Sequence, residues 1–292
     1  MNYSIRHTTS YTYHEPVGIC HNIARLIPRN TAHQNCTKRE ISISPEPSMM
    51  NEFIDFFGNH VIYFSVDKEH SKLVVTVNTE VEKTRTLDPT PESVSHVSVE
   101  ETIEEMQQPG LETATIRQFA FATPMTQWND EIAAYAAESF PDGRTVLEGS
   151  FDLMNRIHLD FTFSSGITTI ATPVSEVMKQ RKGVCQDFAH LGISCLRSVG
   201  LAVRYISGYI ETISPKGREK LVGADASHAW FSVYIPGMGW VDFDPTNNQI
   251  PGDQHITIGW GRDYADIAPF RGIILSSGTH DLAVAVDVER TT

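Results

Sequence analysis

The chain has 292 residues, enough for two compact units, and its 40% hydrophobic and 20% charged residues are typical of a folded globular protein. The formal net charge of −13, with no basic cluster, argues against binding to nucleic acid or to an anionic membrane. No apolar run approaches the ~20 residues that a membrane-spanning helix needs.

Strand-like alternation dominates the first part of the chain. Residues 3–7 alternate between apolar and polar side chains, and residues 73–77 form a continuous run that favours a β-strand. Prolines and glycines separate such runs, as turn residues do. We therefore expect residues 1–88 to form a small antiparallel β-sandwich. Because the N-terminus opens on this alternation and not on a charged segment followed by an apolar one, we expect a cytoplasmic location.

A change in composition marks residues 89–110 as a linker. Prolines gather at its two ends, and an acidic run near residues 100–107 fits a short helix. The first helix after the linker covers residues 131–140, which are alanine-rich, with Asn129 or Asp130 as its N-cap.

The next two helices have clear start signals. Thr145 and Glu148 form a capping box, and the apolar stripe of the helix that they open includes His158. We therefore expect His158 to be packed and not catalytic. Pro173 fits the first position of a further short helix, which Gly183 is expected to end.

Cys185 stands at the start of the following apolar helix. Apolar residues recur at helical spacing over residues 188–199, and Gly200 stands where a helix-ending glycine belongs. The free N–H groups and positive dipole end of a helix stabilise a thiolate, which is the nucleophilic form, and the basic residues 181–182 add positive potential. A free cysteine is also often a small buried hydrophobe, so this position alone leaves both interpretations open.

Strands follow the cysteine helix, and we predict them at residues 203–210, 228–235, 240–243 and 283–288. His228 opens the second of these strands, and an aspartate closes the third. A cysteine at a helix start, a histidine at a strand start and an aspartate at a strand end form the layout of a thiol triad. Helices followed by antiparallel strands also indicate an α+β unit.

Several residues compete for each role in such a triad. His190 lies five positions after the cysteine, about 140° around the helix from it, so His228 is the better general base. Asp242 and Asp244 point to the same face of their strand, because side chains alternate with a period of two. Asp187 lies in the first helical turn, where a carboxylate ordinarily complements the helix dipole.

Three motifs carry a resemblance to a known family: Gly-x-Cys-x-Asp at residues 183–187, His-Ala-Trp at 228–230 and Trp-x-x-x-Asp-Pro-Thr at 240–246. The pattern resembles the transglutaminase-like superfamily, in particular its bacterial branch with an extra N-terminal region. The similarity covers most of the chain and is weakest between about residues 86 and 149.

The resemblance implies a papain-like or transglutaminase-like core in residues 111–292, after the N-terminal β domain. It also implies that Cys185, His228 and Asp244 form the catalytic triad, with Asp242 as the reserve carboxylate. The activity that it favours is acyl transfer by a cysteine peptidase or amidase on a peptide or protein substrate. The alternatives are a protein-glutamine transglutaminase and a non-enzymatic peptide-binding or assembly module.

Acyl transfer passes through an oxyanion that two hydrogen-bond donors are expected to stabilise, and the sequence assigns only one of them. The backbone N–H of Cys185 is one of them. In papain-like enzymes a glutamine commonly lies six residues before the cysteine, but Lys179 occupies that position here and Gln180 is one residue away. The β domain is expected to present the substrate or to mediate formation of a homo-oligomer.

No cofactor is expected from the sequence. Four cysteines in a chain of this length do not form a disulfide framework, which favours a reducing compartment. A zinc site built from Cys20, His21, His33 and Cys36 is disfavoured, because a paired C-x-x-C is missing. No D-x-D-x-D-G calcium loop occurs either. We therefore expect neither a metal ion nor an organic cofactor.

Overall fold

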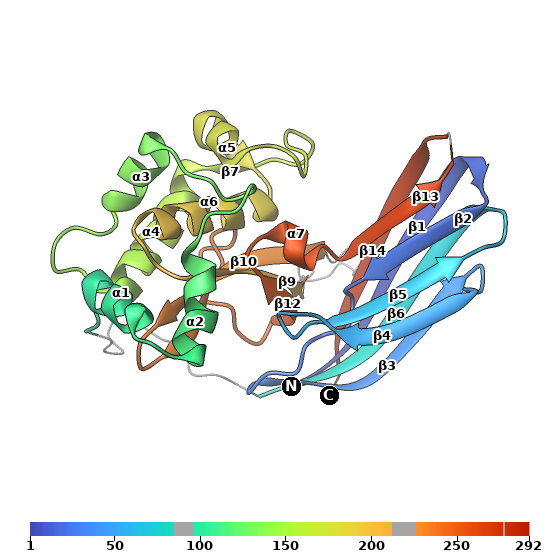
Figure 1. Ribbon diagram of the computed structural model, residues 1–292, viewed down its shortest axis with the longest axis horizontal. Helices are drawn as coiled ribbons and strands as arrows, with labels where there is room; N and C mark the ends of the chain where they lie inside the picture. The colour runs from blue at the N-terminus through green and yellow to red at the C-terminus, as the bar shows by residue number, and fades with distance from the viewer. Residues whose placement is uncertain (85–95, 212–225, 277, 292) are drawn as a thin grey trace, which may run out of the picture.

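The computed structural model describes residues 1–84, 96–211, 226–276 and 278–291. Figure 1 shows a β-sandwich at one end of the molecule and, at the other, helices gathered around a further antiparallel sheet. This arrangement confirms the predicted α+β fold class with an N-terminal β region. No helix within these ranges is long and apolar enough to cross a membrane.

The β-sandwich consists of two four-stranded antiparallel sheets. One has the order β14-β1-β6-β3 and is built from β14 (His280–Thr291), β1 (Asn2–Val17), β6 (His70–Lys83) and β3 (Gln34–Ser44). The other has the order β13-β2-β5-β4 and is built from β13 (Phe270–Leu275), β2 (Ile19–Ala24), β5 (His60–Val66) and β4 (Met49–Ile54). Because side chains alternate along each strand, residues such as Tyr13, Phe64 and Leu73 fill the core of the sandwich.

The last two strands of the chain complete this sandwich. β14 pairs with β1 along most of its length, and β13 pairs with β2. The expected division, which placed all of residues 111–292 in the catalytic unit, is therefore corrected: residues 270–275 and 280–291 pair with the N-terminal strands. Alternation at residues 283–288 does show that a strand is present, but its partner is decided by contacts that are distant in sequence.

The expected linker at residues 89–110 contains the predicted short helix, α1 (Val99–Gln107). A capping box begins it, because the Ser98 hydroxyl accepts the Glu101 N–H and the Glu101 carboxylate accepts the Ser98 N–H. Residues 89–95 of this segment lie outside the described residues.

The remaining helices surround the further sheet. They are α2 (Leu111–Arg117), a 3-10 turn (Gln118–Ala120), α3 (Asp130–Ala137), α4 (Val146–Asp160), α5 (Val174–Gln180), α6 (Cys185–Ser198) and α7 (Tyr264–Ile267). The predicted caps are present: the Asn129 side chain accepts the Ile132 N–H at 3.0 Å, and Thr145 forms a capping box with Glu148.

Two local predictions about the helices were wrong. His158 is exposed near the end of α4, where its Nδ1 lies 3.1 Å from the carbonyl oxygen of Thr246, so it does not pack with the apolar stripe. His158 lies about 100° around the helix from Ile157, which faces the core, so its ring is at the margin of the buried face. The α5 helix ends at Gln180, and its C-cap is Arg181, which adopts a left-handed conformation (φ 54°), and not Gly183.

The further sheet has the order β11-β10-β9-β12 and is antiparallel throughout. It consists of β11 (Gly239–Phe243), β10 (Ala226–Ile235), β9 (Val203–Ile210) and β12 (His255–Gly261), and the last of these was not predicted. The α6 helix packs against this sheet at a position where a Cβ on Gly192 would lie 2.4 Å from the Phe231 ring. This close approach brings the N-terminus of α6 to the same region as the start of β10.

Candidate active site

Cys185 is the first residue of α6 and is half-buried. The Asp187 carboxylate fixes this helix start, because its Oδ2 accepts the Val184 N–H at 2.8 Å and the Thr168 hydroxyl at 2.6 Å. A Cβ on Gly183 would lie 2.8 Å from this carboxylate, so a side chain there would displace it. Asp187 thus positions the backbone beneath the thiol, in agreement with the structural role expected for it.

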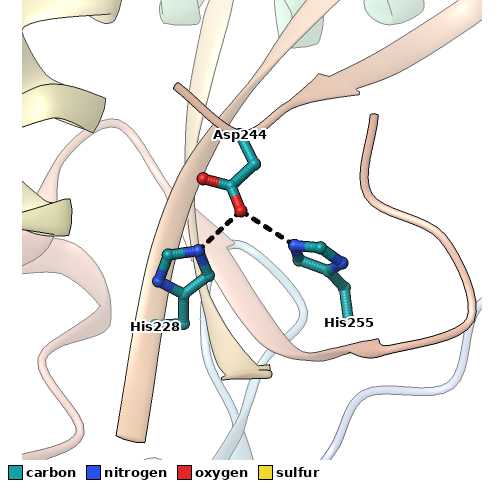
Figure 2. Close-up of side chains that lie close together, drawn as sticks. All are labelled: His228, Asp244 and His255. Atoms are coloured by element: carbon teal, nitrogen blue, oxygen red, sulfur yellow. Dashed lines mark hydrogen bonds and ion pairs between the residues drawn. The ribbon is translucent and has the colours of Figure 1, made fainter. Parts of the chain in front are cut away.

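His228 and Asp244 meet at the edge of the sheet. His228 lies in β10 and Asp244 directly follows β11, and the His228 Nε2 is 2.8 Å from the Asp244 Oδ2. Figure 2 shows the carboxylate lying between His228 and a second histidine. Because the His228 Nε2 donates to the carboxylate, its Nδ1 is the ring nitrogen available to a thiol.

The Cys185 thiol lies near enough to the His228 imidazole to raise its pKa. Burial lowers the pKa of His228, but the hydrogen bond to Asp244 and the influence of Cys185 outweigh it, so this pKa is raised to about 10. Burial also raises the pKa of Asp244, yet its hydrogen bonds from the two histidines leave that pKa below its usual range. The arrangement therefore favours an imidazolium held between a carboxylate and a sulfur atom.

The Asp244 carboxylate is fully buried and accepts several hydrogen bonds. Its Oδ2 accepts from the His228 Nε2, from the His255 Nε2 at 3.0 Å and from the Asn247 Nδ2 at 2.7 Å. Its Oδ1 accepts the backbone N–H groups of Thr246 and Asn247 at 3.0 and 3.3 Å. These donors keep the group ionised and fix the direction in which it faces His228.

His255 is the member of this cluster that the sequence analysis missed. It begins β12, is 2% exposed, and its Nδ1 has no hydrogen-bond partner among the described residues. Burial is the main reason that the pKa of His255 is lowered, so the ring is a neutral donor to Asp244 through Nε2. The alternation over residues 255–258 was a strand signal, but nothing local indicated that this strand would pair with β9.

The competing residues lie in other environments. Asp242, the reserve carboxylate, accepts the Trp230 Nε1–H at 3.0 Å. The His190 Nε2 accepts the Tyr264 N–H at 3.2 Å, and burial lowers the pKa of His190 to about 3. The Gln180 amide, considered as an oxyanion donor, donates to Glu176 at 2.7 Å on α5. None of these contacts involves Cys185 or His228.

The remaining thiols lie away from this cluster. Cys20 is buried in β2, where the Asn22 Nδ2 donates to its sulfur, and Cys36 lies in β3 of the opposite sheet. Burial raises the pKa of Cys195 to about 12, and it also raises the pKa values of Cys20 and Cys36. Cys185 is the cysteine that stands at a helix start beside an imidazole.

A metal ion could in principle be held by His228, Asp244 and His255, because one donor atom from each lies within 4.8 Å of the others. The Asp244 Oδ2, however, lies 2.8 and 3.0 Å from the two Nε2 atoms, which are hydrogen-bond distances. The three side chains thus satisfy one another as donors and acceptor, which fits a proton-handling cluster better than a metal centre.

Two family profiles match this chain. Residues 3–82 match the bacterial transglutaminase-like N-terminal region, and residues 133–245 match the transglutaminase-like superfamily. The second match contains Cys185, His228 and Asp244.

Relatives with similar sequences span nearly the whole chain. An uncharacterised protein of Mycobacterium tuberculosis is 38% identical over 98% of this chain and 92% of its own length. Another, from Mycobacterium leprae, is 32% identical over 97% of each chain. A crystal structure from Cytophaga hutchinsonii, described as a candidate cysteine protease, covers 100% of this chain and 92% of its own with a TM-score of 0.75. At 22% identity, this last similarity shows a shared fold.

Proposed function

The chain belongs to the transglutaminase-like superfamily, and on that basis we propose that it is a thiol acyl-transfer enzyme with Cys185, His228 and Asp244 as its catalytic residues. The observation that carries this proposal is the His228 imidazole, which hydrogen-bonds the Asp244 carboxylate and lies near Cys185 at the start of a helix. Among acyl-transfer reactions, the proposal is hydrolysis of a peptide or carboxamide bond.

The first half of the reaction forms a thioester. His228, whose raised pKa favours the imidazolium, carries the Cys185 proton on Nδ1, and the thiolate sulfur attacks the carbonyl carbon of the substrate. The carbon–nitrogen bond then breaks, and the imidazolium gives its proton to the departing amine. The amine leaves, and the acyl group stays on Cys185.

The surrounding groups stabilise the charges that develop. Asp244 holds the tautomer of His228 with Nε2 protonated and stabilises the imidazolium. The Cys185 N–H is at the first position of α6, where a helix leaves its N–H groups without an intrahelical acceptor, so it can donate to the oxyanion. In the second half, His228 takes a proton from water, and the hydroxide attacks the thioester carbon. The carbon–sulfur bond then breaks, which releases a carboxylic acid and returns Cys185 as a thiolate beside the imidazolium.

The same thioester would react with a primary amine in a transglutaminase, so the acceptor has to be measured. Incubation with a peptide library and an excess of a primary amine, followed by mass spectrometry of the products, distinguishes the two. We expect hydrolysed peptides, whereas amine adducts would indicate a transglutaminase.

Fractionation of cells would test the cytoplasmic location, which stays a prediction.

Cys185→Ala is the decisive variant, with Cys36→Ala as a matched control in another partly exposed cysteine. We expect Cys185→Ala to fold normally and to form no thioester, because alanine keeps the helix backbone, and Cys36→Ala to retain activity. Failure to trap any acyl-enzyme between about pH 6 and 9 with the wild type would favour a non-enzymatic peptide-binding or assembly module.

A further inference from the structure

A cleft of about 840 Å³ lies on the side of the sheet that carries His228, between that sheet and the strand ends of the sandwich. The ends of β3 and β6 contribute His33, Gln34 and Lys83 to its walls. The sheet contributes Arg204, Ser232 and Asp242, which are direct neighbours across β9, β10 and β11. Residues on adjacent strands in such register have side chains on one face, about 5 Å apart at Cβ.

Two polar groups in this cleft have no hydrogen-bond partner among the described residues. Arg204 makes no hydrogen bond or ion pair within the described part of the chain, and its Nε is fully buried. The Ser232 hydroxyl, on a residue that is 1% exposed, also has no partner among the residues described. Unpaired buried donors are costly, so two of them in adjacent positions on one wall indicate an acceptor from outside the chain.

The side chains around Arg204 fix the direction from which a ligand can reach its guanidinium N–H groups. Its guanidinium carbon lies 3.7 Å from the centre of the Trp240 ring and 4.4 Å from that of Trp260. Stacking on aromatic rings occupies the faces of a guanidinium and leaves its N–H groups at the edge. Burial lowers the pKa of Arg204 to about 9, which still leaves it positively charged at neutral pH. A planar acceptor that approaches edge-on, such as a carboxylate, fits this arrangement.

The other charges in the cleft limit the charge of its occupant. Lys83 donates to the carbonyl oxygens of Gly252 and His255, and the carboxylates Asp242 and Asp253 line the same cleft. Two cations and two carboxylates leave no net formal charge, which disfavours a dianion such as phosphate. Apolar side chains complete the lining, namely Ile206, Met238, Trp240, Val241, Ile250 and Pro251.

We propose that this cleft is a binding site for a monocarboxylate with an apolar body, such as the free C-terminus of a peptide, whose carboxylate is held by Arg204 and Ser232. The site is separate from Cys185 and does not depend on the proposed acyl transfer. Trp230 stands between the two: its indole donates to Asp242 in the cleft wall, and its ring centre lies 5.9 Å from that of His228.

Binding can be measured by calorimetry in the Cys185→Ala protein, which cannot turn the ligand over. The probes are acetyl-Ala-Leu with a free carboxylate, the same dipeptide as its C-terminal amide, and inorganic phosphate. We expect saturable binding of the acid and at least about tenfold weaker binding of the amide, because a hydrogen bond to a charged group is lost.

Two variants with matched controls test the residues. Arg204→Met should weaken binding of the acid at least about tenfold, whereas Lys38→Met, which removes an exposed charge on the sandwich, should not. Ser232→Ala should weaken binding of the acid about fivefold. Ser150→Ala, which removes a buried α4 hydroxyl without a hydrogen-bond partner among the described residues, should not weaken it. The serine variants keep the test valid even if Arg204→Met does not fold.

Four results would overturn the proposal. They are no saturable binding of the acid up to about 10 mM, equal binding of the acid and the amide, tighter binding of phosphate, and unchanged affinity in a folded Arg204→Met or Ser232→Ala protein. Absent binding, equal binding of the acid and the amide, or unchanged affinity in a variant would leave Arg204 as a cation stacked on aromatic rings. Tighter binding of phosphate would make the cleft a site for another class of anion.

Discussion

Replacing Asp244 with asparagine removes a charge while keeping the shape of the side chain. The carboxylate accepts three hydrogen bonds at Oδ2 and two at Oδ1, whereas an amide has one acceptor oxygen. If the amide oxygen faces the two histidines, its NH₂ group opposes the backbone N–H groups of Thr246 and Asn247. If it turns around, three donors lose their acceptor, so the first orientation is preferred.

The expected loss in the free energy of unfolding follows from that orientation. Two partly buried N–H groups without an acceptor should destabilise the fold by less than about 2–6 kcal/mol, the sum for full burial at about 1–3 kcal/mol each. The neutral amide also no longer stabilises the imidazolium, and burial, which lowers the pKa of His228 in the wild type, is then opposed mainly by Cys185. By analogy with the serine triad, thioester formation should slow by about 10³ to 10⁴.

The rate of alkylation of Cys185 by iodoacetamide, followed by mass spectrometry from about pH 5 to 9, gives a direct measurement. Wild-type alkylation should persist at mildly acidic pH, because His228 keeps its proton up to about pH 10. The Asp244→Asn protein should react much more slowly there. Asp263→Asn, which alters another buried carboxylate at the start of α7, is the control and should keep the wild-type profile.

A folded Asp244→Asn protein with the wild-type rate and pH profile would refute the role given to this carboxylate. A larger loss in Asp242→Asn than in Asp244→Asn would assign that role to Asp242 instead. Circular dichroism and thermal unfolding of each variant separate these outcomes from a failure to fold.

Three further predictions concern other parts of the molecule. Brief iodoacetamide treatment at mildly acidic pH should label Cys185 at least about tenfold faster than the other three cysteines, and preferential labelling of Cys195 or another thiol would contradict its role. His255→Phe should slow thioester formation about tenfold and shift its pH profile, because Asp244 loses one of its donors; an unchanged profile in a folded protein would make His255 purely structural. Burial lowers the pKa values of His7 and His190 to about 4 and about 3, so the stability that they contribute above pH 6.5 should fall as the pH drops, by about 2 kcal/mol each at about pH 5. Urea unfolding at several pH values should show a shallower dependence in His7→Asn, and an unaltered slope would count against this account.

Local signals in the sequence were sufficient for helices α1, α3, α4 and α6 and for the elements that carry Cys185, His228 and Asp244, whereas α2, α7 and His255 were missed. Caps such as Thr145 with Glu148 depend on residues within one turn, so they are visible without any knowledge of the fold. The same holds for Cys185 at the start of α6 and for strand β9, which has the predicted bounds. Helical periodicity did not decide the burial of His158, because the buried face of α4 runs through Ser150, Leu153 and Ile157 and leaves His158 at its margin.

Tertiary structure decided every feature that depends on which strands become neighbours. The pairing of β14 with β1 makes the sandwich from both ends of the chain, and the pairing of β12 with β9 brings His255 onto Asp244. Arg204 and Ser232 are 28 residues apart in sequence and become a pair only through the register of β9 and β10. The physical reason is that alternation fixes which face of a strand a side chain occupies, whereas the neighbouring strand is chosen by hydrogen bonds and packing between segments distant in sequence.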